Sequence, residues 1–165
     1  MAAQEALAPS QTIPETMASA VITGCKAKYS YTGKQVKPLI QVVWNGKILR
    51  NNTDYTLLYK NNKKRGSAGI VVTGKGNYSG TLTASFTIVR ASVKKASVTG
   101  LKAVYARTGK AVKPKVTVKL GGKKLKKKRD YILSYRKNKK KGTALLYVKG
   151  VGNYSGTKKM KFKIR

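Results

Sequence analysis

The chain has 165 residues, enough for one ordinary domain or two small ones, and a hydrophobic content of 41% that allows a core. It holds 37 Lys and Arg against 4 Asp and Glu, a formal net charge of +33, and Lys is far commoner than Arg. Such a charge attracts polyanions broadly. The chain has no His, the commonest general base and zinc ligand, so we expect no enzymatic activity, no cofactor and no metal site.

The first twenty residues differ in composition from the rest. They hold Pro9 and Pro14 and lack Lys and Arg, so we expect residues 1–20 to be a flexible leader or linker. No apolar run reaches the roughly 20 residues that a membrane span requires, and no signal-peptide pattern is visible. The single cysteine, Cys25, corresponds to Leu101 in the repeat described next, so we expect a buried, inert thiol.

The remainder of the chain is a duplication. The blocks YTGKQVKP, DYTLLYKNNKKRG and GKGNYSGT recur as RTGKAVKP, DYILSYRKNKKKG and GVGNYSGT, each 76 positions later, as Asp54 and Asp130 show. Residues 22–89 therefore pair with residues 98–165 without a gap. This pattern predicts a repeat over 21–90, a short linker over 91–97 and a second repeat over 98–165.

Within each repeat the apolar residues alternate with polar ones. The segment 55–59 and its copy 131–135 place Tyr, Leu and Tyr at every second position, which is typical of strands with one buried face. Asn-Gly at 45–46 and Gly-Gly at 121–122 predict tight hairpins. The fold class expected is all-β: two small antiparallel sandwich or Greek-key domains.

The order of these blocks, with NGK and a closing Phe-x-Ile, resembles Ig-like β-sandwich repeats that occur in tandem in secreted and cell-surface proteins of Gram-positive bacteria. The resemblance covers both copies and omits the leader. It implies a secreted or wall-attached protein, such as part of an adhesin or a stalk, and polyanions of that surface as partners.

The charge is concentrated in the second repeat, which has twenty-three Lys and Arg over 98–165 against twelve over 22–90. Neutral residues occupy many corresponding sites of the first repeat, so the fold itself does not require the cations. The candidate polyanion-binding residues are Lys63, Lys64, Arg65, Lys123, Lys124, Lys126, Lys127, Lys128, Arg129, Arg136, Lys137, Lys139, Lys140, Lys141, Lys158, Lys159, Lys161 and Lys163. The last four are expected on the water-facing side of the final strand.

Clustered cations bind an anionic polymer by releasing its counterions. The candidate partners are teichoic acid, a sulfated glycan or nucleic acid, bound by a monomer without a membrane span. Tyr29, Tyr105, Tyr147, Tyr78 and Tyr154 are candidates for exposed stacking surfaces. Two alternatives remain: a structural stalk whose charge serves solubility, and a nonspecific nucleic-acid-binding protein in the cytosol.

Asp54 and Asp130 occupy the same position in the two repeats. We expect each carboxylate to accept backbone N–H groups at the turn that enters the Tyr-Leu-Tyr strand. Asn77 and Asn153 are expected in tight turns, although both also fit a glycosylation sequon. A Lys–Asn isopeptide crosslink promoted by one of the acids is a further alternative.

Overall fold

The computed structural model describes residues 13–165, and over that range the protein is all-β. The first repeat contains β1 (Glu15–Thr16), β2 (Val21–Thr23), β3 (Lys28–Ser30), β4 (Gln41–Trp44), β5 (Lys47–Ile48), β6 (Tyr55–Lys60), β7 (Gly66–Gly74), β8 (Tyr78–Ser79) and β9 (Thr81–Val89). The second contains β10 (Ala91–Ser92), β11 (Ser97–Thr99), β12 (Val104–Tyr105), β13 (Thr117–Leu120), β14 (Lys123–Lys124), β15 (Tyr131–Arg136), β16 (Gly142–Gly150), β17 (Tyr154–Ser155) and β18 (Thr157–Ile164). In the described residues the helical segments are two single 3-10 turns, η1 (Met17–Ser19) and η2 (Val93–Lys95).

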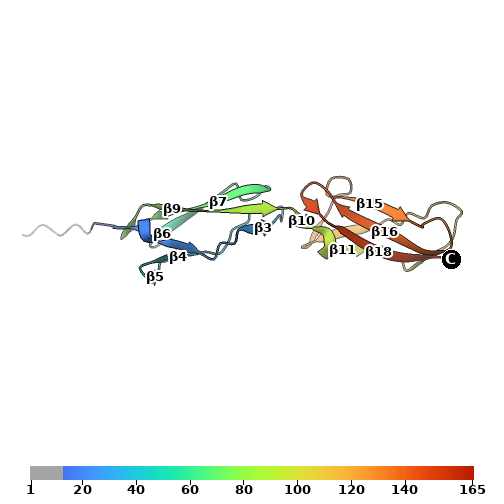
Figure 1. The fold of residues 1–165 in the computed structure, drawn as a ribbon, viewed down its shortest axis with the longest axis horizontal. Helices are drawn as coiled ribbons and strands as arrows, with labels where there is room; N and C mark the ends of the chain where they lie inside the picture. The colour runs from blue at the N-terminus through green and yellow to red at the C-terminus, as the bar shows by residue number, and fades with distance from the viewer. Residues whose placement is uncertain (1–12) are drawn as a thin grey trace, which may run out of the picture. The chain divides into compact units, whose positions relative to one another are not determined.

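The two repeats share one strand order. In the first, β2-β4-β5 form one sheet, β3-β9-β7-β6 form another, and β1 pairs with β8. In the second, the corresponding sheets are β11-β13-β14 and β12-β18-β16-β15, with β10 paired to β17. Figure 1 shows β15, β16 and β18 running side by side. The predicted duplication thus extends to the hydrogen-bonding pattern.

The core of the second repeat lies between its two sheets. Val118 of β13 and Val148 of β16 are both fully buried in one cluster with Leu125 and Tyr131. Along β16, Ala144, Leu146 and Val148 are buried, while the residues between them are exposed or half-buried. The predicted period-two alternation is confirmed, because successive side chains of a strand point to opposite faces.

Two hairpins occur where the sequence predicted them. Asn45 and Gly46 join β4 to β5 with φ of 46° and 78°, and Gly121 and Gly122 join β13 to β14 with φ of 55° and 76°. Positive φ at both central residues is the geometry of a two-residue hairpin whose twist matches that of the flanking strands. Asn and Gly tolerate it better than other residues do.

The structure differs from the sequence prediction at the start of each repeat. Residues 15–20 were expected in a leader and 91–97 in a linker, yet both segments pack into a repeat. Met17 of η1 and Val93 of η2 each have 0% exposure. The hydroxyls of Thr16 and Ser92 accept hydrogen bonds from the backbone N–H two residues later, at 3.3 Å in each case. Alternation of apolar and polar residues did not reveal these segments, because their strands have two residues each and each segment buries one large apolar side chain. The first twelve residues of the predicted leader lie outside the described range.

Spatial proximity divides the chain into two compact units. Within the described range, one consists of residues 13–28, 37–62 and 67–87, and the other of 29–36, 63–66 and 88–165. Each sheet nevertheless takes its strands from a single repeat. Among the described residues, no helix is long and apolar enough to cross a membrane.

Candidate polyanion-binding surface

Two lysine-rich turns flank β15 in the second repeat. Residues 126–129 precede the strand and residues 137–141 follow it, and all of their lysine side chains are exposed. Six residues at roughly 3.4 Å each span about 20 Å, so the two turns lie at opposite ends of the strand. The predicted cations are therefore not gathered in one small pocket. They are spaced along a length that suits an extended ligand.

The first of these turns is organised around a buried carboxylate, Asp130. Its Oδ2 accepts the backbone N–H of Lys126 at 2.8 Å, and Lys128 adopts a positive φ of 71°. The Arg129 guanidinium donates to Asp130 through Nε and Nη2, both at 2.9 Å. These hydrogen bonds from Arg129, aided by the Lys126 N–H, hold the pKa of Asp130 below its usual range despite burial. Because its charge is paired here, Arg129 is a weaker candidate for an external anion than its neighbours.

Asp54 has the corresponding role in the first repeat. Its Oδ2 accepts the backbone N–H of Arg50 at 2.7 Å. In both repeats the carboxylate thus stabilises the turn that enters the Tyr-Leu-Tyr strand. An isopeptide crosslink in the second repeat would need Asp130 as the promoting acid, but the Asp130 carboxylate forms an ion pair with Arg129.

A second cationic region lies on one face of a sheet. The side chains of β16 and β18 that point away from the core come together with Arg136 of β15 on the outer side of the four-stranded sheet. We call this the outer sheet face: Arg136, Tyr147, Lys149, Lys159, Lys161 and Lys163. Tyr147 pairs with Lys159 across the strands, and the Arg136 guanidinium lies 5.6 Å from the centre of the Tyr147 ring. The arrangement places an aromatic ring among cations on rigid strands.

The first repeat has the same sheet, but of the five cations on the outer sheet face it retains a counterpart only of Arg136, namely Lys60. The other corresponding residues, 76 positions earlier, are neutral: Val71 for Tyr147, Thr73 for Lys149, and Thr83, Ser85 and Thr87 for Lys159, Lys161 and Lys163. Because both sheets fold with the same strand order, the lysines are not needed to form the sheet. Lys149 was not among the candidate site residues. The sequence feature that could have identified Lys149 is the replacement of Thr73 by a cation at an outward-facing position.

Some predicted site residues lie elsewhere than expected. Lys158 shares the inward side of β18 with Phe162, is half-buried, and donates its Nζ to the backbone carbonyl of Ala96. It was expected on the water-facing side. Side chains of a strand alternate between the two faces, however, and Lys158 falls on the inward one. Lys123 is half-buried as well, in contrast to the exposed Lys124.

The tyrosine and cysteine predictions also need correction. Tyr78 and Tyr154, proposed as surface stacking candidates, are buried with 6% and 3% exposure. Both lie on short strands, β8 and β17; the Tyr78 ring packs edge-on against Trp44, and Tyr154 belongs to the core cluster with Val93 and Val148. Tyr147 remains a half-buried candidate on the outer sheet face. Cys25, expected to be buried, is half-buried.

The remaining predicted residues occupy turns. Lys63, Lys64 and Arg65 are exposed between β6 and β7, the position that residues 139–141 fill in the second repeat. Asn77 and Asn153 precede β8 and β17, and their backbone carbonyls accept the N–H groups of Glu15 and Ala91.

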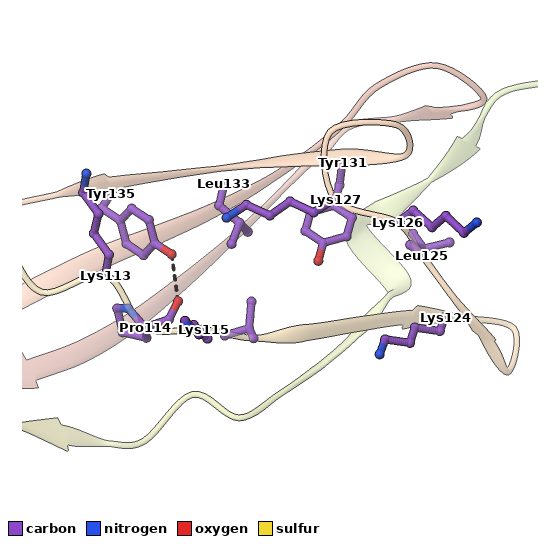
Figure 2. Close-up of a pocket in the computed structure, with 11 residues that line it drawn as sticks. Lys113, Pro114, Lys115, Lys124, Leu125, Lys126, Lys127, Tyr131, Leu133 and Tyr135 are labelled. Carbon is purple, nitrogen blue, oxygen red and sulfur yellow. Dashed lines mark hydrogen bonds between the residues drawn. The ribbon is translucent and has the colours of Figure 1, made fainter.

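A cavity of about 880 Å³ in the second repeat is lined by residues 113–116, which lead into β13, by residues 124–127 and by β15 (Figure 2). Its apolar lining comes from Pro114, Val116, Leu125, Tyr131, Leu133 and Tyr135. The Tyr135 hydroxyl donates to the Pro114 carbonyl at 2.8 Å, the bond drawn as a dashed line. Five lysines, which we call the rim lysines, complete the lining: Lys113, Lys115, Lys124, Lys126 and Lys127. Lys113 and Lys115 were not singled out from the sequence.

Compared with models of known protein families, with curated proteins and with solved structures, the chain finds no match in any of the three.

Proposed function

We propose that the protein binds an extended anionic polymer without catalysing a reaction, and that the second repeat makes the main contact. The observation that carries this proposal is the outer sheet face. Lys149, Lys159, Lys161 and Lys163 occupy positions where the first repeat holds Thr or Ser on the same sheet. Since the fold forms with neutral residues there, a role outside folding favours the cations.

The spacing of the charges supports a polymer over a compact ligand. The two lysine-rich turns lie at opposite ends of β15, and the outer sheet face lies on the sheet between them. A chain with regularly repeated negative charges could contact all three regions at once and release its counterions from each. Teichoic acid, a sulfated glycan and nucleic acid all have this property.

We also propose that each repeat is an Ig-like sandwich and that the protein is secreted or attached to a bacterial cell wall. The sequence blocks that the two copies share support this, together with two facing sheets and an intervening core in the second repeat. Expression of the encoding gene with its native upstream region, followed by fractionation of medium, wall and cytosol, tests the location. Recovery in the cytosol alone would favour the nucleic-acid-binding alternative.

Binding of heparin, wall teichoic acid and single-stranded DNA across a salt series tests the function. We expect the logarithm of the association constant to fall linearly with the logarithm of salt concentration, with a steep slope. The face variant, Lys159→Thr/Lys161→Ser/Lys163→Thr, installs the residues of the first repeat and should flatten that slope. Reversal of residues 126–128 or 139–141 to Glu should weaken binding more strongly. Absence of binding at low salt would leave the stalk alternative.

A further inference from the structure

The cavity of the second repeat differs chemically from the rest of its cationic surface. Its floor is made of buried and half-buried apolar side chains, Leu125, Tyr131 and Leu133 among them, where a sandwich edge opens to solvent. A volume of about 880 Å³ lies within the range of about 300–1,000 Å³ typical of small-molecule sites. A polymer that is charged at every unit would leave such an apolar floor unfilled.

The rim of the cavity carries positive charge without compensation. None of the residues that line it is Asp or Glu. Asp130, the acid nearest in sequence, is already engaged by Arg129 and the Lys126 N–H. Burial raises the pKa of Tyr131 and Tyr135, so their hydroxyls stay neutral and add no negative charge. In Figure 2 the Lys127 side chain lies beside Tyr131 and Leu133, whereas Lys126 points away from the tyrosines.

Comparison of the repeats shows that the floor is retained and the rim is changed. The floor residues Tyr131, Leu133 and Tyr135 correspond to Tyr55, Leu57 and Tyr59. The rim residues Lys115, Lys124 and Lys127 replace Leu39, Ile48 and Asn51. Leu39 and Ile48 are largely exposed in the first repeat, at 94% and 57%. Lys113 and Lys126 correspond to Lys37 and Arg50, so the second repeat adds three cations to a rim that already carries two in the first.

We propose that this cavity binds a single-chain amphiphilic anion, that is, an alkyl chain with a phosphate, sulfate or carboxylate group. The alkyl chain lies on the apolar floor between residues 113–116 and β15, and the head group contacts the rim lysines. Burial of methylene groups supplies affinity that salt does not screen, while the lysines select a negative head group. This site is separate from the outer sheet face and does not depend on polymer binding.

Calorimetric titration of the whole chain with n-alkyl phosphates, from butyl to decyl and below their critical micelle concentrations, tests the proposal. Two variants each remove three positive charges and install residues that the first repeat already carries. The rim variant is Lys115→Leu/Lys124→Ile/Lys127→Asn, and the face variant Lys159→Thr/Lys161→Ser/Lys163→Thr is its matched control. Circular dichroism confirms that both remain folded.

We expect affinity to rise by up to about fourfold for each added methylene, from about 0.8 kcal/mol per buried group. The rim variant should lose about tenfold or more in affinity for decyl phosphate, because charge-assisted hydrogen bonds to the head group are lost. The face variant should stay within about twofold of the unmodified chain, because its charges lie on another surface. The methyl resonances of Val116 and Leu133 should shift on binding.

Equal loss in the two variants, or affinity independent of chain length, would overturn the proposal and leave general attraction of anions to a cationic surface. Binding to phosphatidylglycerol vesicles is measured in parallel, to distinguish a free amphiphile from a membrane surface as the ligand. Binding to vesicles without binding to monomeric alkyl phosphates would also overturn it. Failure here leaves polymer binding unaffected, since that function is tested by the response of heparin, teichoic acid or DNA to the face variant.

Discussion

The guanidinium of Arg129 contacts the carboxylate of its neighbour Asp130 through two hydrogen bonds of 2.9 Å, and the Asp130 side chain is buried while that of Arg129 is largely exposed. The pair joins a lysine-rich turn to the core strand β15. It lets this turn hold its cations in a fixed conformation, although like charges repel one another.

Acid should destabilise the protein through Asp130. Its folded-state pKa is depressed by Arg129, so its contribution to the free energy of unfolding is present above the unfolded value of about 3.9. That contribution is lost as the pH falls through the lower folded-state pKa. Urea unfolding as a function of pH should show a decline beginning below about pH 4. In Asp130→Asn this decline should be reduced, and a decline of unchanged size would contradict the assignment.

Asp130→Asn should also cost more stability than Asp54→Asn. The Asp130 carboxylate accepts hydrogen bonds from the Arg129 guanidinium and from the Lys126 N–H, whereas Asp54 follows Thr53 and so has no Arg at that position. Hydrogen bonds to charged groups contribute about 1.5–3 kcal/mol each. We expect Asp130→Asn to lower the free energy of unfolding by about 2 kcal/mol at neutral pH. Equal losses in the two variants, measured by chemical denaturation, would show that Arg129 adds nothing.

Lys158 and Lys159 are neighbours with opposite orientation, and they provide a matched pair for polymer binding. Lys158→Leu and Lys159→Thr each remove one charge and each install the residue of the first repeat. Because Lys158 faces inward and donates to Ala96, its loss should leave the salt slope for DNA nearly unchanged. Loss of Lys159 should reduce the slope by about 0.7–0.9, the value for one phosphate contact. A larger reduction of the salt slope for Lys158→Leu than for Lys159→Thr would show that the binding surface lies elsewhere.

The variant Tyr147→Val tests whether the outer sheet face prefers a nucleic acid or a sulfated glycan as its ligand. Tyr147 lies among the cations of the outer sheet face, and Val71 shows that the strand accepts the smaller residue. A base that stacks on an aromatic ring gains about 1–3 kcal/mol. We expect weaker binding of single-stranded DNA, by about fivefold or more, with heparin affinity unchanged, as measured by fluorescence anisotropy. An equal effect on both polymers would exclude base stacking.

Met17→Ala tests whether the first repeat begins before Val21. Met17 is fully buried, and truncation of a buried Met to Ala costs about 2–5 kcal/mol. Ile13→Ala is the control, because Ile13 is 87% exposed and surface substitutions usually change stability by less than about 0.5 kcal/mol. If both variants lower the stability in thermal unfolding by equally small amounts, residues 15–20 belong to a leader and not to the first repeat.

Much of the fold could be predicted because the duplication supplied an internal comparison. Positions that stay apolar in both copies, such as Leu57 and Leu133, mark the buried face. Positions that exchange Thr for Lys, such as Thr87 and Lys163, mark the solvent face. Hairpins followed from Asn-Gly and Gly-Gly, which tolerate positive φ.

The features that the sequence did not reveal depend on contacts between distant segments. Lys158 alternates in phase with Phe162, and a charge at such an inward position is unfavourable without a partner. The partner is the backbone carbonyl of Ala96, near the start of the repeat, which accepts a hydrogen bond from the Lys158 ammonium group. Tyr154 lies on a strand of two residues, too short for any period, and is buried by the core cluster that includes Val93 and Val148. The cavity requires the spatial approach of residues 113–116 and 124–127 to β15, which no local pattern encodes.

A transfer of charge between the two outer sheet faces is the most direct test of polymer binding. The starting chain carries Lys159→Thr/Lys161→Ser/Lys163→Thr, and the transfer adds Thr83→Lys/Ser85→Lys/Thr87→Lys on β9 of the first repeat. Titration with heparin and with single-stranded DNA across a salt series should show that the first set of changes weakens binding and that the second restores most of the lost affinity and salt slope. Unchanged binding after Lys159, Lys161 and Lys163 are replaced, in a chain that remains folded, would contradict the account.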